Sequence, residues 1–193
     1  MYPFIKRLMD IFASVLLLLL LMPMFIVVAL LIKLGSKGPL LFTQERLGFN
    51  GNVFKLYKFR SMTDAKRDAL EQVHQNTAEI TWIGNIIRRL KIDELPQLLN
   101  VLVGDMSLVG PRPCMEATKL DFNEDGHKRL LVRPGLTGLA QVNGNIFLDW
   151  PERWALDREY VENVSLMLDI KIILRTVLIV VLGEQWGKKG RKS

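Results

Sequence analysis

The longest apolar run of the chain lies near its N-terminus. Residues Ile11 to Ile32 carry no charge, and Ser14 and Pro23 are the interruptions. As a straight helix this run would extend roughly 33 Å, enough to cross a bilayer core. Pro23 removes one helical hydrogen bond near the middle. From the residues alone, the run predicts either a single membrane span or a helix that breaks at Pro23 and turns back.

Basic residues flank this run on both sides. Lys6 and Arg7 precede it, and Lys33 and Lys37 follow it. Basic residues prefer the cytoplasmic side of a membrane, so basic flanks at both ends do not indicate which way a single span would be oriented. The same preference is satisfied when the helix turns back and both flanks stay on the cytoplasmic side. The whole net charge of +6 falls within residues 1–60. Positive charge so close to an apolar run favours anionic lipid headgroups over nucleic acid as a partner.

The pattern then changes to that of a β-hairpin. Strands are predicted around Leu40–Thr43 and Val53–Phe59, joined through Gly48 and Asn50-Gly51. Residues 64–80 are polar and predict a solvated, helix-compatible surface.

Two later stretches predict helices. Apolar periodicity indicates a helix that begins at or near Asp93 and runs to Val103, with Gly104 ending it. Ser165–Leu182 is also apolar, but its charged side chains argue against a second span and favour a helix that lies in the membrane interface or packs on the core. Those side chains are Asp169, Lys171 and Arg175.

Composition and motifs exclude several classes of protein. The 193 residues suit one domain, or one domain with an anchor, rather than a multi-span transporter. Cys114 has no partner for an intramolecular disulfide, and His74 and His127 are isolated, so no zinc site is predicted. Glycine-rich nucleotide loops are absent from the sequence, which argues against an ATPase or a nicotinamide enzyme. Aromatic and basic residues are not interleaved as in a single-strand nucleic-acid groove.

The most suggestive chemistry lies in residues 88–97. Asp93 and Glu94 follow three basic residues and precede Pro96, which is tolerated in the first turn of a helix. A helix N-terminus attracts phosphate, and an ionised carboxylate there suits a nucleophile or a magnesium ligand. The alternative is that Asp93 only caps the helix and Glu94 is a first-turn acid.

Arginines strengthen the interpretation as a phosphate site. Arg60, Arg88, Arg112 and Arg133 lie in or beside the predicted turns and helix starts, and Arg112 stands between two prolines. Guanidinium groups match phosphate oxygens bidentately, so converging arginines indicate a diphosphate ligand. The residues by themselves therefore predict a phosphate ligand handled at a membrane surface.

A series of short motifs runs along nearly the whole chain, from about Lys6 to Leu182. In order they are Lys6-Arg7 with Asp10, Phe42-Thr43-Gln44-Glu45-Arg46 with Gly48, Tyr57-Lys58-Phe59-Arg60-Ser61-Met62, Asp93-Glu94-Leu95-Pro96-Gln97, Asn100-Val101, Gly104-Asp105-Met106-Ser107, Val109-Gly110-Pro111-Arg112-Pro113, Arg133-Pro134-Gly135-Leu136-Thr137-Gly138, Ala140-Gln141-Val142, Asp157 and Tyr160. This series resembles that of the small monotopic phosphoglycosyl transferases, a family of bacterial sugar transferases.

The resemblance implies transfer of a sugar phosphate from a UDP-sugar to polyprenol (undecaprenyl) phosphate, with release of UMP. By family analogy Asp93 is the nucleophile that forms a covalent phosphosugar intermediate, and Glu94 assists it. Magnesium is the implied cofactor, with Asp93 as its protein ligand. The implied substrate-binding residues are Lys58, Arg60, Arg88, Arg112, Arg133 and Gln141.

The family also implies the architecture. We expect an α/β protein, mostly helical with little sheet, bound to one face of the membrane. Residues 1–36 are expected to form a re-entrant helix-break-helix with its break at Pro23. Residues 37–182 are expected to form the catalytic domain with interfacial amphipathic helices, and residues 183–193 a basic tail. The expected location is the cytoplasmic face of the bacterial inner membrane.

The expected partners are the UDP-sugar, polyprenol phosphate, anionic membrane lipids and downstream glycosyltransferases, with a homodimer left open and no nucleic acid. Two departures from the family pattern stand out: Met22 replaces the usual serine before Pro23, and Asn145-Ile146 replaces Arg-Asn. Two other functions compete with the transferase: a membrane-associated UDP-sugar hydrolase and a non-catalytic membrane-anchored scaffold.

Overall fold

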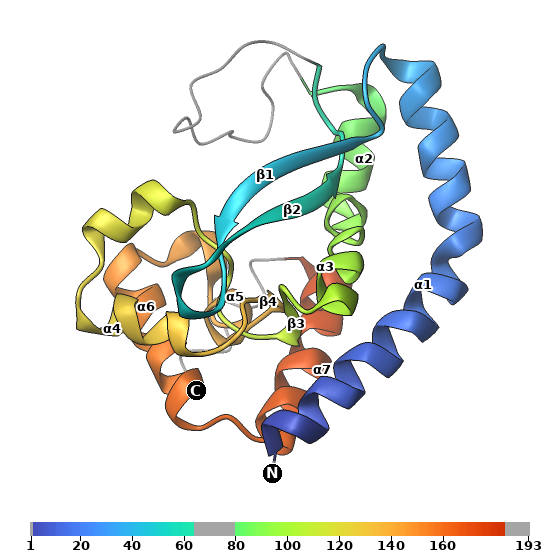
Figure 1. Ribbon diagram of the computed structural model, residues 1–193. Helices are drawn as coiled ribbons and strands as arrows, with labels where there is room; N and C mark the ends of the chain where they lie inside the picture. The colour runs from blue at the N-terminus through green and yellow to red at the C-terminus, as the bar shows by residue number, and fades with distance from the viewer. Residues whose placement is uncertain (1, 64–79, 184–193) are drawn as a thin grey trace.

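The computed structural model describes residues 2–63 and 80–183. These residues form a mostly helical molecule with little sheet, which confirms the predicted composition of the fold (Figure 1). The helices and strands are α1 (Tyr2–Gly35), β1 (Leu41–Leu47), β2 (Val53–Phe59), α2 (Trp82–Arg89), α3 (Gln97–Val103), β3 (Ser107–Val109), α4 (Glu124–Lys128), β4 (Gly135–Thr137), α5 (Leu139–Val142), α6 (Trp150–Glu162) and α7 (Leu166–Leu182). Most of the polar segment 64–80 and of the tail 183–193 lies outside the described residues.

Helix α1 is continuous and bends along one side of the molecule (Figure 1). Pro23 lies inside it, and the break that the family resemblance implies at this residue does not separate two helices. A proline removes one hydrogen bond and bends a helix, but the remaining bonds let the helix continue. Within the described residues, α1 is the one helix long and apolar enough to cross a membrane.

Both ends of α1 contact the same globular body. Its buried residues fall in two groups, Asp10 with Ser14 and Val28 with Ile32, while large apolar side chains between the two groups are exposed. Val28 and Ile32 pack with Phe59 of β2 and with two buried isoleucines of α2. The apolar middle of α1 therefore stands away from the body that its two ends contact.

The predicted hairpin is confirmed. β1 and β2 pair in antiparallel register from Leu41 opposite Phe59 to Leu47 opposite Val53. Asn50 adopts a left-handed conformation with φ 56° in the connecting turn, as the Asn-Gly pair predicted.

The side chain of Asn100 links α3 to the other edge of β2. Asn100 is fully buried; its Oδ1 accepts from the Tyr57 backbone N–H at 3.1 Å, and its Nδ2 donates to the Lys55 carbonyl at 2.7 Å. These two bonds satisfy backbone groups at the edge of β2 that a third strand would otherwise pair with. They also hold Lys58, the next residue of β2, near the start of α3.

The predicted start of the helix at Asp93 is wrong, whereas its end at Gly104 is confirmed. Asp93 lies in a short 3₁₀ turn, Ile92–Glu94, and the α-helix begins at Gln97. Pro96 has no N–H to give to the Ile92 carbonyl, which accepts instead from Leu95 three residues on. Gly104 ends α3 in the left-handed region with φ 104°.

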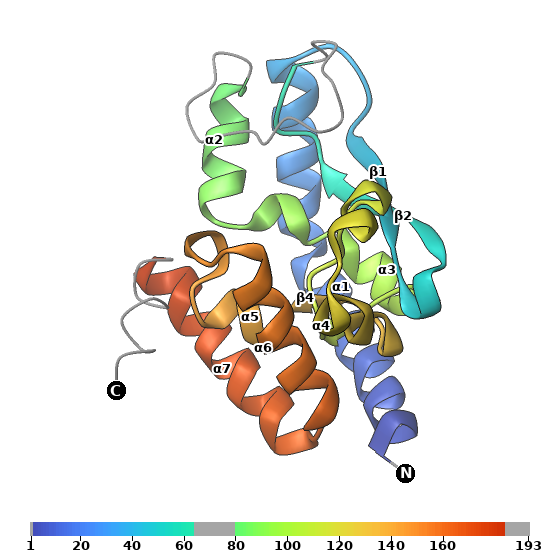
Figure 2. The ribbon, with the colours of Figure 1, turned by 90° about the vertical axis from the view of Figure 1, so that its left-hand side faces the viewer.

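The C-terminal part forms a second layer. β3 and β4 pair in parallel, and α5 contacts both α6 and α7 (Figure 2). The predicted helix in Ser165–Leu182 is confirmed as α7, which Ser165 caps by accepting from the Leu168 backbone N–H. Buried Ile172 packs α7 on a core that includes Val109, Leu139 and other apolar residues, and its predicted place in the membrane interface stays a prediction.

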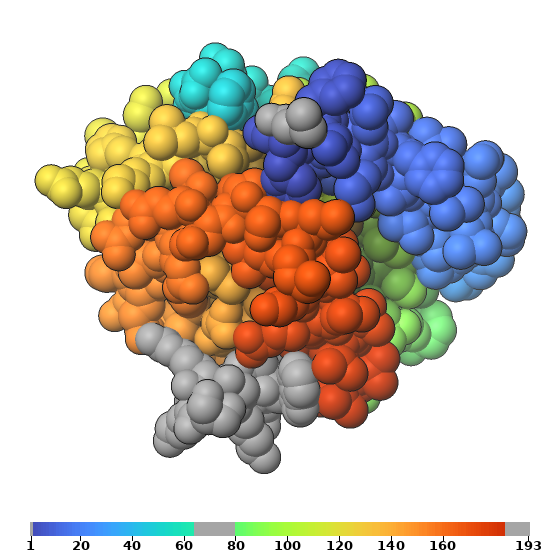
Figure 3. Space-filling model, turned by 90° about the horizontal axis from the view of Figure 1, so that it is seen from below, coloured from blue at the N-terminus to red at the C-terminus, as the bar shows by residue number. Residues whose placement is uncertain are grey.

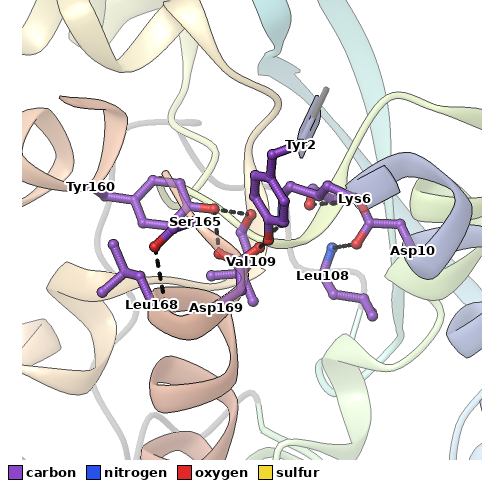
Figure 4. A network of polar contacts seen from close by, with 10 residues as sticks. Tyr2, Lys6, Asp10, Leu108, Val109, Tyr160, Ser165, Leu168 and Asp169 are labelled. Atoms are coloured by element: carbon purple, nitrogen blue, oxygen red, sulfur yellow. Dashed lines mark hydrogen bonds and ion pairs between the residues drawn. The ribbon is translucent and has the colours of Figure 1, made fainter. Parts of the chain in front are cut away.

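A network of polar contacts joins the start of α1 to the C-terminal layer (Figure 4). The buried Asp169 carboxylate of α7 accepts from the Tyr2 hydroxyl, from Lys6 Nζ at 2.6 Å and from the Tyr160 hydroxyl at 2.8 Å. One helical turn after Lys6, Asp10 accepts from the Ser107 hydroxyl and the Leu108 backbone N–H of β3. The start of α1 and α7 accordingly lie side by side on the surface (Figure 3).

We expect Asp169→Asn to lower the free energy of unfolding by about 2–4 kcal/mol, because it leaves the partly buried Lys6 ammonium without its anion. Thermal unfolding in detergent measures the change. Glu162→Gln is the matched control, since Glu162 pairs with Lys128 at the surface and should matter little. Equal effects of the two substitutions would contradict a structural role for the Asp169 network.

Candidate phosphate-transfer site

Three segments that are distant in sequence meet at the Glu94 carboxylate. Lys58 of β2 donates to its Oε1 at 2.9 Å, and Arg112 of the loop after β3 donates to the same oxygen at 2.6 Å. The Glu94 side chain is 13% exposed. Charge-assisted bonds of this kind hold a buried carboxylate in a fixed position.

Tight packing of the loop after β3 places Arg112. A Cβ atom at Gly110 would lie 2.4 Å from the Arg133 carbonyl oxygen, so this close approach requires glycine. The Pro111 carbonyl accepts from the Gly135 backbone N–H at 2.9 Å, and the Arg112 carbonyl accepts from Arg129 Nη2. The backbone of Arg112 is thus fixed on both sides, while 43% of its side chain remains exposed.

Asp93 lies next to Glu94 in a different environment. Asp93 is buried, at 9% exposure. Among the described residues, 2–63 and 80–183, no partner forms a hydrogen bond with its carboxylate. Lys91, two residues earlier, adopts a left-handed conformation with φ 57° that begins the 3₁₀ turn. Asp93 is therefore held by the backbone of the turn, whereas Glu94 is held by its side-chain partners.

These environments move the two carboxyl pKa values apart. Burial and the neighbouring Glu94 charge raise the pKa of Asp93, against the opposing effect of Lys58, Arg88 and Lys91. Burial would also raise the pKa of Glu94, but Arg112 and Lys58 hold it well below its usual range. Two neighbouring acids with separated pKa values are typical of a reactive site, because each can take a different role.

The arrangement suits nucleophilic chemistry at a phosphate. Glu94 is occupied by two cations, so Asp93 is the carboxylate of the pair with oxygens available for a phosphorus atom or a metal ion. A carboxylate with a raised pKa and little hydration is a better nucleophile than an exposed one. Lys58, Arg88 and Arg112 surround the pair with positive charge.

The structure brings Lys58, Arg88 and Arg112 to the two acids but not Arg60 or Arg133. Buried Arg60 donates to the Ser36 and Lys37 carbonyls after α1. Arg133 Nε donates to the Gly104 carbonyl at 2.8 Å, at the end of α3 opposite the acids. Both guanidinium groups thus serve backbone carbonyls, which sequence position alone did not reveal.

Gln141 and the departure at Asn145-Ile146 lie in the C-terminal layer. Gln141 Nε2 donates to the Leu136 carbonyl at 3.3 Å, and its buried Oε1 has no hydrogen-bond partner in the described part of the chain. Asn145 adopts φ 47°, and Ile146 is exposed. The Gln141 bond stays within this layer and does not reach Asp93 or Glu94.

Sequence reasoning missed Arg46 as a site residue. Half-buried Arg46 of β1 has a lowered pKa because of burial and of nearby Arg112, with Glu94 acting in the opposite direction. Arg46 pairs with Phe54 across the hairpin, and paired residues share one face of a sheet. The feature that could have identified Arg46 from the sequence is a charged residue on the sheet face that also carries the buried Phe54 and Leu56.

Protein ligands for a metal ion are few here. No group of three or more histidine, cysteine, aspartate or glutamate side chains gathers within residues 2–63 and 80–183. Magnesium is commonly held by one or two carboxylates together with substrate phosphates. Asp93, without a competing hydrogen bond among the described residues, fits that mode of binding.

The sequence model of bacterial sugar transferases matches residues 1–183. The chain belongs to the bacterial sugar transferase family. It is 43% identical over 182 residues to an uncharacterized sugar transferase, EpsL, of Bacillus subtilis, with 93% of this chain and 89% of that protein covered. It is 47% identical over 188 residues to the exopolysaccharide production protein PSS of Rhizobium leguminosarum, covering 90% and 94%.

A longer relative carries a more specific name. The chain is 49% identical over 185 residues to an undecaprenyl-phosphate glucose phosphotransferase of Komagataeibacter xylinus, covering 89% of this chain but 35% of that protein. The chain thus spans about a third of this relative and nearly the full length of the other two. The family predicted from the short motifs is confirmed.

We expect Glu94→Gln to lower the pKa of Asp93. The substitution removes the neighbouring negative charge and leaves Lys58, Arg88 and Lys91 to favour the ionised form of Asp93. Carboxyl-carbon NMR titration of isotopically labelled aspartate measures the pKa. The control is Glu45→Gln, at an exposed position of β1. An Asp93 pKa that rises or stays constant in Glu94→Gln would contradict this electrostatic arrangement.

Proposed function

We propose that the chain transfers a sugar phosphate from a UDP-sugar to polyprenol phosphate, yielding polyprenyl-diphosphate-sugar and UMP. The observation that carries this proposal is the pair of acids with divided roles: Asp93 available beside Glu94, which Lys58 and Arg112 fix. A relative in Escherichia coli, 41% identical over 182 residues, is named UDP-glucose:undecaprenyl-phosphate glucose-1-phosphate transferase. Its printed name supports the proposed classes of donor and acceptor.

The proposed reaction has two displacement steps. In the first, an Asp93 oxygen bonds to the sugar-linked phosphorus, and the bond from that phosphorus to the bridging oxygen breaks. UMP leaves with the electron pair, and an aspartyl phosphosugar remains. In the second, a phosphate oxygen of polyprenol phosphate bonds to the same phosphorus and releases Asp93 as a carboxylate. An ionised nucleophile requires no base in either step.

The surrounding residues have separate tasks in this proposal. Lys58, Arg88 and Arg112 attract the diphosphate and stabilise the charge that develops on its oxygens. Glu94 holds Lys58 and Arg112 in position beside the reacting oxygens. A magnesium ion held by Asp93 and the substrate phosphates would supply further positive charge.

We also propose that α1 enters one leaflet and returns, with both ends on the cytoplasmic face of the inner membrane. Near its N-terminus Lys6 and Asp10 contact α7 and β3, and near its C-terminus Val28 and Ile32 contact the β2–α2 region. A straight span would put these ends on opposite sides of the bilayer, whereas one body binds both. The basic flanks support the same placement.

Labelled UDP-sugar incubated with magnesium and without polyprenol phosphate tests the transfer. We expect about one UMP per enzyme and label retained on the protein, because the phosphosugar has no acceptor. Asp93→Ala should abolish both signals, whereas the control Asp121→Asn, at an exposed position, should retain them. Continuous UMP release would instead favour the hydrolase, and the absence of release with a panel of UDP-sugars would favour the scaffold.

Single cysteines at Pro3 and Lys37, in a Cys114→Ala background, test the path of α1. Both positions are exposed. An impermeant maleimide should label both in inside-out membrane vesicles and neither in right-side-out vesicles. Labelling of one position in each kind of vesicle would show a span and contradict the re-entrant helix.

A further inference from the structure

Helices α5 and α7 pack side by side (Figure 2), and residues of both line an apolar groove of about 330 Å³. Its floor is formed by Leu139 and Val142 of α5 and by Ile172 of α7, all buried members of one core cluster. The volume falls within the range of small-molecule sites, about 300–1,000 Å³. Water finds few hydrogen-bond partners over such a floor, so the groove favours an apolar occupant.

Two basic side chains of α7 line the same groove. Lys171 and Arg175 are four residues apart, so they lie on one side of the helix. Lys171 is exposed and Arg175 is half-buried. Neither forms a hydrogen bond or an ion pair with any residue of 2–63 and 80–183. A guanidinium that loses water without gaining a partner is costly, and an anion in the groove removes that cost.

The acidic residue of α7 serves other partners. Asp169 is the single acid between Leu166 and Leu182. Its carboxylate accepts from the Tyr2 hydroxyl, from Lys6 and from the Tyr160 hydroxyl. Its bonds are thus directed to the start of α1 and to α6, and the groove combines an apolar floor with two cations.

An apolar stripe of α7 continues beyond the groove. Leu174 lines the groove, and Val177, Leu178 and Val181 follow it at helical spacing on the same face. All four side chains are exposed, between 43% and 75%. A long apolar chain that starts in the groove therefore has a continuous apolar surface to lie on, and exposed apolar surface of this kind marks a binding site.

This part of α7 lies on the face of the molecule that also carries the start of α1 (Figure 3). Leu8 and Phe12 of α1 are exposed there. With α1 placed in one leaflet, as proposed above, this face meets the lipid headgroups. Residues 184–193 carry more basic than acidic side chains, so their charge repeats that of the groove and does not complement it. A membrane lipid with a negative charge does complement it.

We propose that the groove between α5 and α7 binds one anionic phospholipid, with an acyl chain over the apolar floor and the phosphate between Lys171 and Arg175. The planar guanidinium of Arg175 can bind two phosphate oxygens at once, and the Lys171 ammonium adds a second charge. This inference uses the proposed membrane placement of α1 but not the transfer reaction. A lipid bound here gives the body a second attachment beside α1 and fixes its orientation on the membrane.

Native mass spectrometry of the detergent-solubilised full chain tests the headgroup. The probes are phosphatidylglycerol and phosphatidylethanolamine with identical acyl chains. We expect wild type to retain one phosphatidylglycerol and to bind it at least about tenfold more tightly than phosphatidylethanolamine, which carries no net charge. The double variant Lys171→Gln/Arg175→Gln should lose this preference. The matched control Lys128→Gln/Arg158→Gln removes the same charge from side chains that pair with surface acids and should keep it.

The variant Leu174→Glu tests the acyl chain. Leu174 is 61% exposed, so a carboxylate there leaves the core intact but repels both the chain and the phosphate. We expect it to weaken phosphatidylglycerol binding at least about tenfold. Met167→Glu, at a position 63% exposed on the same helix but outside the groove, is the control. Glycerol 3-phosphate, which has no chain, should not displace the lipid.

Several results would overturn the proposal. No preference for phosphatidylglycerol in wild type, or the same loss in both double variants with wild-type thermal unfolding, would show that no specific site exists. Displacement by glycerol 3-phosphate would reduce the ligand to a phosphate ion. Tighter binding of polyprenol phosphate, abolished by Lys171→Gln/Arg175→Gln, would assign the groove to the acceptor instead. The labelled UDP-sugar experiment reports on the transfer separately, so each failure can be told from a failure of the proposed function.

Discussion

A carboxylate that leaves water needs donors or cations, and in this chain the partners come from distant segments. Asp10 joins α1 to β3, and Asp169 joins α1, α6 and α7. Glu94 joins the 3₁₀ turn to β2 and to the loop after β3, and Asp157 joins α6 to Arg129. Because these carboxylates bond to different segments, they stabilise both the packing of α1 on the rest of the molecule and the geometry of the candidate site.

The candidate site depends on how unevenly two neighbouring acids are satisfied. Glu94 takes both nearby cations, so its charge is fixed and its pKa is low. Asp93 is buried beside that charge, and its pKa is raised. The same backbone turn thus gives one acid a structural task and leaves the other available for a phosphorus atom. Arg129 holds the backbone of Arg112 by donating a hydrogen bond to its carbonyl.

Features governed by neighbouring residues were predictable. Two strand-like stretches and the Asn50-Gly51 turn predicted the β1–β2 hairpin, and Gly104 predicted the end of α3, where it adopts the left-handed conformation. The apolar run predicted a helix of membrane-spanning length, and the unusual pair of Asp93 and Glu94 pointed to the site. The prediction was wrong at the start of α3. Pro96 was placed in the first turn of an α-helix that begins near Asp93, but Asp93 lies in a 3₁₀ turn before Pro96 and the α-helix begins at Gln97.

The sequence by itself determined the elements, the family motifs and the pair of acids, because short-range sterics and periodicity decide them. Tertiary structure alone decided which cations serve that pair. Lys58 and Arg112 donate to Glu94, whereas Arg60 and Arg133 donate to backbone carbonyls. Arg46, which the sequence did not single out as a site residue, lies near Arg112 and Glu94. An arginine can donate hydrogen bonds to a carbonyl as well as to a carboxylate, so its role depends on which acceptor folding brings within reach.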